Sequence, residues 1–167
     1  MMLEIALDSD EEWDSSSDWL QLVRNAAQAA LAESAYPDLA SDRPVEISIT
    51  LTGDDEVHAL NSKWRGKDKP TNVLSFPMAD ERDLRAANVA AAELLLGDIV
   101  LAHGVCAAEA AEKGLTIEQH ATHLVVHGTL HLLGYDHHDD RDAAEMETRE
   151  VRALARLGIA NPYEVAA

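Results

Sequence analysis

The chain has 167 residues, with 13 basic against 31 acidic side chains, which gives a formal net charge of −18. This length suits one domain with a continuous core, so we expect residues 1–167 to fold as a single unit. The single cysteine excludes an intrachain disulfide and a thiolate metal cluster, and the acidic balance argues against a general nucleic-acid binder.

The amino-terminal part predicts two strands with a helix between them. Its first 14 residues have no basic flank before an apolar run, and no stretch is apolar over the length of a membrane span, so we expect a cytoplasmic protein with no membrane partner. Alternating apolar residues predict strands over 3–7 and 45–52, and apolar residues at helical spacing predict a helix over 20–31.

A second helix is predicted from Asp54, as its N-cap, to a stop near Gly66. Four of the 13 basic residues lie within seven positions at the end of this helix and just beyond it, namely Lys63, Arg65, Lys67 and Lys69. Taken alone, this run favours a solvated basic loop over a binding site. It nevertheless allows a locally positive surface on an acidic protein.

The carboxyl-terminal part predicts two short buried strands and three helices. Apolar runs indicate strands over 73–76 and 96–101, and helices are indicated over 105–113, from a Thr116–Gln119 capping box, and from Asp139 or Asp140 to Gly158. We expect the connection over 77–95, including an alanine-rich stretch over 86–92, to lie over the mouth of a site. The order of elements implies an α+β fold, a small mixed β-sheet of about four strands packed with helices.

Three histidines in the helix that begins at the capping box, and just after it, indicate a metal site. His127 and His131 are four residues apart, so on a helix they project one turn apart from the same face. Gly134 can adopt the left-handed conformation that ends a helix, which carries His137 back to the same ion. Three imidazoles with an open fourth position are typical of catalytic zinc, so we predict one Zn²⁺, although other divalent transition metals also suit these ligands.

The spacing His-x-x-x-His-x-x-Gly-x-x-His is also that of metzincin proteases, so the metal helix is zincin-like. Those enzymes carry a glutamate directly after the first histidine as general base, whereas this chain has Gly128. A peptidase or amidase would therefore need a relocated base, for which Asp136 and Glu145 are candidates.

The histidine motif, with Tyr135 and Asp136 inside it, resembles the signature of the YbeY family of bacterial endoribonucleases. Segments 60–65, 68–77 and 96–100 are also similar to the family, and the similarity covers roughly residues 45–157. The chain departs from the family at Asn72, where an aspartate is usual, and this removes a charge from that position.

The resemblance implies a zinc-dependent endoribonuclease, specific for single-stranded RNA, that acts in maturation of the 3′ end of 16S ribosomal RNA and in ribosome quality control. It implies single-stranded RNA, ribosomal RNA and the small ribosomal subunit with its proteins as partners. It also favours Arg65 as the catalytic residue, since a guanidinium matches phosphate geometry and stays charged. Lys63 and Ser75 are weaker candidates for binding the substrate phosphate. The attacking group is either a metal-activated water or the ribose 2′-hydroxyl.

Two carboxylates, Asp98 and Asp136, are candidates for orienting a ligand imidazole through its second nitrogen. A buried structural contact for Asp98 and a turn cap for Asp136 are the alternatives. We expect His120 and His123 to belong to the scaffold or rim, and a variant lacking His138 to retain metal.

A third possibility for function is a metal-stabilised, non-catalytic ribosome assembly factor that binds its partners through the acidic surface. The enzyme hypothesis predicts that Arg65→Glu destroys RNA cleavage and leaves metal content unchanged, and the assembly-factor hypothesis predicts no cleavage to lose.

Overall fold

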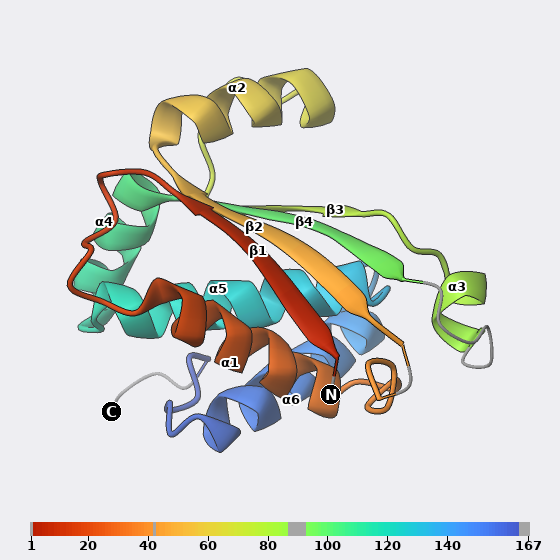
Figure 1. Cartoon of the computed structure of the whole chain (residues 1–167). Coiled ribbons are helices and arrows are strands. Elements are labelled where there is room, and N and C mark those ends of the chain that lie inside the picture. The colour runs from red at the N-terminus through yellow and green to blue at the C-terminus, as the bar shows by residue number, and fades with distance from the viewer. Residues whose placement is uncertain (1, 42, 87–92, 164–167) are drawn as a thin grey trace.

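The computed structural model describes residues 2–41, 43–86 and 93–163. Ten elements follow one another along the chain (Figure 1): β1 Leu3–Ser9, α1 Trp19–Ala32, β2 Val45–Thr52, α2 Asp54–Arg65, β3 Val73–Pro77, α3 Glu81–Arg85, β4 Leu94–Ala102, α4 His103–Lys113, α5 Ile117–Leu132 and α6 Asp140–Arg156.

The four strands form one mixed sheet in the order β1-β2-β4-β3. Strands β1, β2 and β4 run parallel, and β3 pairs antiparallel with β4 along one edge. The α+β fold with a four-stranded mixed sheet is therefore confirmed.

Helices cover the two faces of the sheet unequally. Figure 1 shows α1 and α5 side by side under one face, with α6 packed against both of them from outside, whereas α2 lies on the opposite face. Helix α5 is thus enclosed between the sheet and two other helices, and it contacts β3 and β4 directly. This enclosure fixes the helix that carries the first two histidines of the motif.

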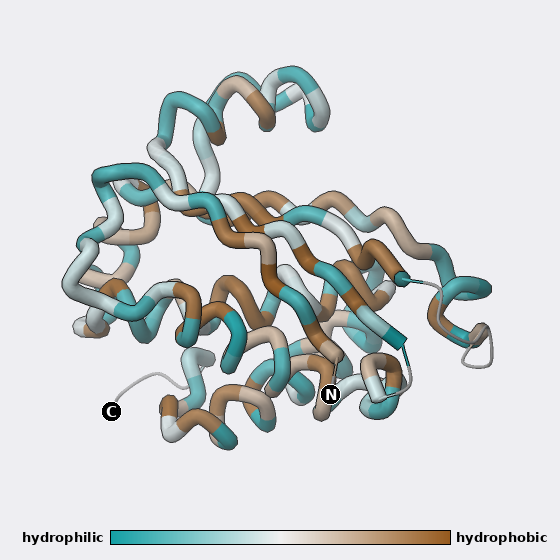
Figure 2. Tube along the Cα trace, viewed as in Figure 1, coloured by the Kyte–Doolittle hydropathy of each residue, from teal (hydrophilic) through white to brown (hydrophobic). Residues whose placement is uncertain are grey.

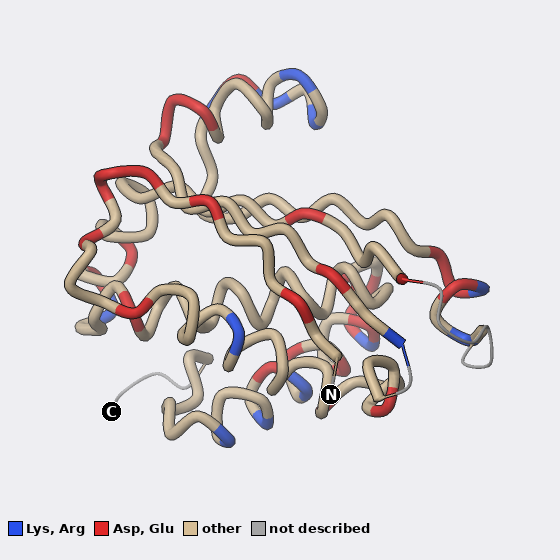
Figure 3. Tube along the Cα trace, viewed as in Figure 1, with Lys and Arg blue, Asp and Glu red and all other residues tan. Residues whose placement is uncertain are grey.

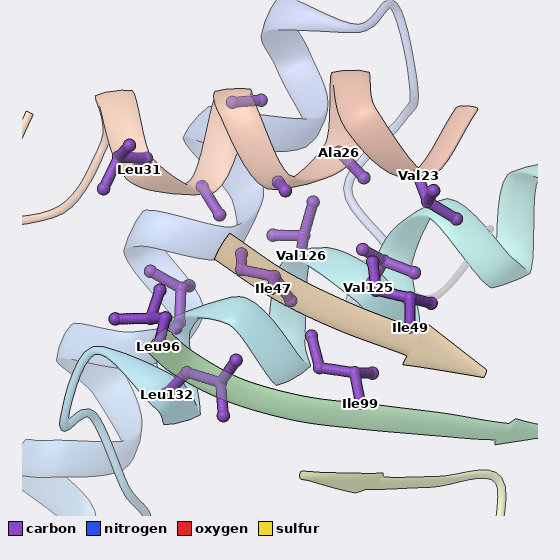
Figure 4. Close-up of a cluster of buried hydrophobic side chains, with 14 of the residues drawn as sticks. Val23, Ala26, Leu31, Ile47, Ile49, Leu96, Ile99, Val125, Val126 and Leu132 are labelled. Atoms are coloured by element: carbon purple, nitrogen blue, oxygen red, sulfur yellow. The ribbon is translucent and has the colours of Figure 1, made fainter. Parts of the chain in front are cut away.

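The main core lies between the sheet and the pair of helices α1 and α5. Figure 4 shows side chains from α1, β2, β4 and α5 interleaved there, and in Figure 2 the same elements carry the apolar segments. Alternation along β2 accounts for the inner face of the sheet, because Val45, Ile47, Ile49 and Leu51 are at most 1% exposed. A smaller apolar cluster on the opposite face contains Val57 of α2 and the strand residues Leu74, Val100 and Ala102.

Several helix ends form at the residues that the sequence predicted. The Thr116 hydroxyl accepts the Gln119 N–H at 3.1 Å, and the Gln119 side chain accepts the Thr116 N–H at 3.0 Å, which completes the capping box. Gly66 and Gly114 end α2 and α4 at φ of 66° and 67°. Asp139, one of two predicted caps, accepts the Asp142 N–H and begins α6.

One prediction about helix ends is wrong. Gly53, not Asp54, is the N-cap of α2, and the Asp54 carboxylate instead accepts the Val105 N–H at 3.1 Å in the first turn of α4. The connection over 77–95 contains a short helix that the sequence did not predict, α3, which begins at a capping box formed by Asp80 and Asp83. Most of the alanine-rich stretch, residues 87–92, lies outside the described residues.

Within the described ranges, no helix combines the length and apolar character needed to cross a membrane.

Candidate metal centre

The three motif histidines converge at the carboxyl-terminal end of α5. Their ligand nitrogens all lie within 4.8 Å of one another, and the His127 and His131 Nε2 atoms are 3.0 Å apart. The His137 ring stacks on the His127 ring, with centroids 5.3 Å apart and planes inclined by 19°. His127 and His131 are partly buried and His137 is exposed, so the cluster opens to solvent on the side of His137.

The chain reaches this geometry through the turn that follows α5. The helix ends at Leu132, and Gly134 adopts a φ of 98°, which is open to glycine and strained for other residues. The Gly134 N–H donates to the His131 carbonyl and the Tyr135 N–H to the Leu130 carbonyl. The predicted reversal at Gly134 is therefore present, and it returns His137 to the helix face.

The hydrogen bonds of the first two rings show that the cluster suits a cation. The His131 Nδ1 must donate, since its partner at 2.8 Å is the Tyr135 carbonyl, and the His127 Nδ1 donates to the Glu150 carboxylate. In neutral rings both Nε2 atoms are then left with lone pairs facing each other at 3.0 Å. Two nitrogens bound to one tetrahedral zinc lie about 3.3 Å apart, so a shared cation turns this repulsion into coordination.

Protonation also favours ligation. Burial, reinforced by the neighbouring His127 ring, lowers the pKa of His131 below its ordinary value. The neutral imidazole that a metal requires is therefore the dominant form near neutral pH.

A buried carboxylate that the sequence did not reveal supports this site. Glu150 of α6 is 0% exposed, bonds His127 through Oε1, and lies with Oε2 3.3 Å from the His123 Nε2 and within hydrogen-bond reach of the Tyr163 hydroxyl. Burial alone would raise the pKa of Glu150, but hydrogen bonds with His123 and His127 hold it well below its usual range. Glu150 is therefore ionised and orients the His127 ring.

The two carboxylates predicted to orient ligand rings lie elsewhere. Asp136 accepts the His137 backbone N–H at 2.7 Å and pairs with His138 at 3.2 Å, so it closes the turn, which was the alternative explanation. Asp98 alternates along β4 with the core residue Ile99 and therefore points to the face of the sheet that carries α2, away from α5. The prediction that Asp98 orients a ligand histidine is therefore wrong, because Asp98 and α5 lie on opposite faces of the sheet.

Arg65, at the last position of α2, reaches the edge of the sheet. Its guanidinium donates to the Ser75 carbonyl on β3 at 2.8 Å and lies 5.7 Å from the Phe76 ring centroid. Ser75 alternates with Leu74 and Phe76, so its side chain points to the face packed on α5. The strand β3 therefore links Arg65 to the metal helix, while Lys63 stays exposed beside Trp64.

Asn72 and His120 belong to a hydrogen-bonded network near the amino-terminal end of α5. The Asn72 amide donates to Glu109 at 3.0 Å, Glu109 also bonds His120 at 2.8 Å, and the Asn72 oxygen accepts the Val73 N–H. An aspartate at position 72 would oppose the Glu109 carboxylate, so the amide suits this network. His120 and His123 are 1% and 7% exposed, as scaffold residues should be, and His138 is exposed and paired with Asp136.

The segment that contains α3 meets the turn after α5. Residues 79–81 and Leu84 share a cavity of about 430 Å³ with residues 133–135, which lead to His137. This shared cavity places part of the 77–95 connection near the turn that leads to the metal cluster.

Comparison with known proteins gives a consistent family match. The family model described as "Endoribonuclease YbeY" matches residues 5–158. A relative named Endoribonuclease YbeY from Novosphingobium aromaticivorans is 53% identical over 96% of each chain, and one of the same name from Rhizorhabdus wittichii is 51% identical over 98% of each. The solution structure of TM1509 from Thermotoga maritima shares the fold, with a TM-score of 0.54 at 22% identity over 98% of this chain and 100% of that one.

Proposed function

Because the chain belongs to the family of endoribonuclease YbeY, we propose that it is a hydrolase that cuts single-stranded RNA internally with the help of one zinc ion held by His127, His131 and His137. We further propose that it acts in the cytoplasm on ribosomal RNA, at the 3′ end of 16S RNA and in ribosome quality control, with the small ribosomal subunit and its proteins as partners.

The observation that best supports this proposal is the facing pair of Nε2 atoms on His127 and His131, with the His137 ring beside them on the solvent side. The Nδ1 atoms of the same two rings are engaged, that of His127 by Glu150 and that of His131 by the Tyr135 carbonyl. The lone pairs of the two Nε2 atoms therefore converge on one point. A zinc ion held by these three histidines would supply a Lewis acid able to polarise a phosphodiester oxygen and to lower the pKa of a water molecule to about 7.

The role assigned to Arg65 is electrostatic. Its guanidinium has five donors, and the Ser75 carbonyl engages one nitrogen at 2.8 Å, which steadies the side chain at the edge of β3. The remaining donors are suited to a phosphate, whose charge grows in the transition state of its hydrolysis. Lys63 and Ser75 are proposed as weaker phosphate contacts, Lys63 from the exposed end of α2 and Ser75 from the face of β3 that packs on α5.

The peptidase alternative has less support because its candidate bases are engaged or displaced. Gly128 supplies no carboxylate, Asp136 bonds the His137 backbone, and Glu145 pairs with Arg149 at 3.2 Å on the exposed side of α6. The relatives are also named for RNA cleavage.

The proposal is tested by elemental analysis and cleavage of single-stranded RNA and of an unstructured peptide. We expect close to one zinc per wild-type chain, loss of metal and of RNA cleavage in His131→Ala, and loss of cleavage with metal retained in Arg65→Glu. His138→Ala is the matched control for His131→Ala and should keep both. Peptide cleavage abolished by His131→Ala would contradict the proposal, as would RNA cleavage that Arg65→Glu leaves intact.

The ends of the RNA products identify the attacking group. A 2′,3′-cyclic phosphate would show attack by the ribose 2′-hydroxyl, and a 5′-phosphate beside a 3′-hydroxyl would show attack by water.

A further inference from the structure

We infer that Trp64 is a stacking platform for one base of single-stranded RNA, with the phosphates on either side held by Lys63, Lys67 and Lys69. This inference rests on the proposed function and adds to it a base-binding residue outside the metal cluster. Figure 3 shows basic segments at the carboxyl-terminal end of α2 and in the loop after it, in a molecule whose formal net charge is −18.

Trp64 continues the apolar stripe of α2 past the edge of the sheet. Val57 is fully buried against the sheet, and Leu60 packs against the same cluster. Trp64 follows Leu60 by four residues and Val57 by seven, so it projects from the same helix face. It is nevertheless 61% exposed, whereas Trp13 and Trp19 are 3% and 5% exposed. Trp64 therefore lies on the apolar face of α2 but beyond the part of that face that the sheet covers. Its large amphipathic ring is available to a binding partner.

The loop after α2 is held in place beside this ring. Asn61, one turn before Trp64 and 2% exposed, donates from its side-chain amide to the Lys69 carbonyl at 2.8 Å and accepts the Lys67 N–H on its own carbonyl at 3.2 Å. The acidic residue of the loop, Asp68, bonds the His58 ring at 2.7 Å. The backbone that carries the two lysines is therefore fixed relative to the helix.

The chemistry of this surface fits a polyanion that also offers flat rings. The Lys63 ammonium lies 5.0 Å from the Trp64 ring centroid, so a cation and a π-face are presented together. Proteins that hold single strands combine a positive track along the backbone with aromatic side chains on which bases stack. An acidic polypeptide would match the charge but offers no series of bases for the ring.

Tryptophan fluorescence gives a direct test, since Trp13 and Trp19 are buried and Trp64 is exposed. The protein is titrated with a short single-stranded oligoadenylate in the His131→Ala background, so that the RNA is not cut. We expect saturable quenching that is absent in Trp64→Phe, although Trp64→Phe should keep most of the affinity because it keeps a ring. An oligonucleotide of the same charge with abasic positions should bind more weakly and quench little.

Affinity measurements separate stacking from charge. Base stacking of ordinary strength predicts that Trp64→Ala and Trp64→Leu bind roughly 5- to 150-fold more weakly, with the salt dependence unchanged. Lys67→Ala should instead reduce the slope of log affinity against log salt by about 0.7. Leu20→Ala, which changes another exposed apolar side chain, is the matched control and should bind as the parent does.

Each outcome supports or overturns the inference. Unchanged affinity in Trp64→Ala, or binding without quenching, overturns it even if wild-type protein cuts RNA. Quenching by poly-aspartate at lower concentration than by RNA assigns the surface to an acidic protein segment and also overturns it. Absence of RNA cleavage by zinc-loaded wild-type protein, with quenching intact, contradicts the proposed nuclease and leaves the RNA-binding surface standing.

Discussion

Glu150 connects α6 to the histidine cluster and fixes the orientation of one proposed ligand. Its carboxylate is fully buried and engages His123, His127 and Tyr163 together. A carboxylate that accepts the second N–H of a ligand imidazole holds the ring in one tautomer and increases its basicity. The orientation of His127 is thus set by a residue on a different helix.

We therefore predict that Glu150→Gln lowers zinc affinity by roughly 10- to 100-fold, the usual cost of losing such a partner. A glutamine keeps the shape and the acceptor oxygen but removes the charge. Affinity is measured by competition with a chromophoric chelator, and the cobalt-substituted protein reports ligand geometry by its visible spectrum. Glu145→Gln makes the same change on the exposed side of α6 and should bind zinc as wild type does. Equal affinities in the two variants would show that Glu150 has only a structural role.

The three motif histidines could be predicted from the sequence and Glu150 could not, because the histidines are close together in the sequence and Glu150 is distant from them. His127, His131 and His137 are brought together by one helix and one turn, which are local features with readable signals. Glu150 is 23 positions from His127, and Asp98 cannot orient a ligand ring because it lies on the other face of the sheet. The role of each carboxylate is therefore decided by tertiary packing. A signal for Glu150 existed, because it occupies the buried stripe of α6 with Met146, Ala153 and Leu154.

At the level of elements, the close approach of α5 to β4 explains why the motif has glycine at position 128. A Cβ atom on Gly128 would lie 3.1–3.3 Å from side-chain atoms of Ile99, which is tighter than ordinary contact. The general base of metzincin proteases would therefore have to occupy a packed core. Gly128 thus allows α5 to pack closely on β4 while the neighbouring His127 faces the metal cluster.

Gly128→Glu should destabilise the metal-free protein by roughly 3 kcal/mol or more, because it forces an unpaired carboxylate against Ile99. It should also fail to confer peptide cleavage. Gly128→Ala is the matched control: the gain in helix propensity of about 1 kcal/mol works against the tight contact, so its stability should stay within about 1 kcal/mol of wild type. Urea unfolding measures both. A Gly128→Glu variant of wild-type stability would contradict the packing argument.

Helix α4 depends on a cap supplied by a different helix. Its own N-cap residue, Ala102, has no side-chain acceptor, and the Asp54 carboxylate of α2 accepts the Val105 N–H instead. Asp54→Ala should therefore cost about 0.5–2 kcal/mol in unfolding free energy. Asp55→Ala removes a charge from the same first turn of α2 and controls for the helix dipole. Equal losses in the two variants would assign the effect to the dipole.

Helix ends could be predicted where the signal is local in the sequence, whereas the strand order could not. Capping boxes and positive-φ glycines act within four or five residues, so the ends of α2, α4 and α5 were predictable from Gly66, Gly114 and the Thr116 box. Asp54 looked like a cap because its residue type suits one, but its acceptor serves a helix about 50 residues later. The strand order β1-β2-β4-β3 places β4 between strands that precede it, which periodicity alone does not encode.

For the whole molecule, the uneven distribution of charge predicts opposite responses to salt. The basic segments at the end of α2 contrast with acidic segments spread over the sheet and the other helices (Figure 3). Binding of RNA through the basic segments should weaken as salt rises. Folding should respond in the other direction, because screening relieves repulsion within a compact chain of formal net charge −18.

One site concentrates this repulsion. Glu4 and Glu46 are directly opposed on neighbouring strands, and carboxylate oxygens of these two residues and Glu93 lie within 4.8 Å of one another. Like charges facing each other across strands are destabilising. We expect Glu46→Gln, which removes the charge between the other two, to raise the melting temperature of the metal-free protein at low salt. Glu112→Gln on α4 changes net charge equally and should raise it less.

Raising NaCl from about 0.01 to 0.1 M shortens the Debye length from about 30 to 10 Å, so it should reduce the difference between these variants. For a chain of this size a gain of about 1 kcal/mol corresponds to roughly 2–4 °C, which calorimetry resolves. A melting temperature that falls with added NaCl, or a Glu46→Gln variant no more stable than Glu112→Gln, would show that the acidic sheet surface does not limit stability. RNA affinity measured over the same salt range must fall if the basic end of α2 binds phosphate, so one titration series tests both halves of the charge distribution.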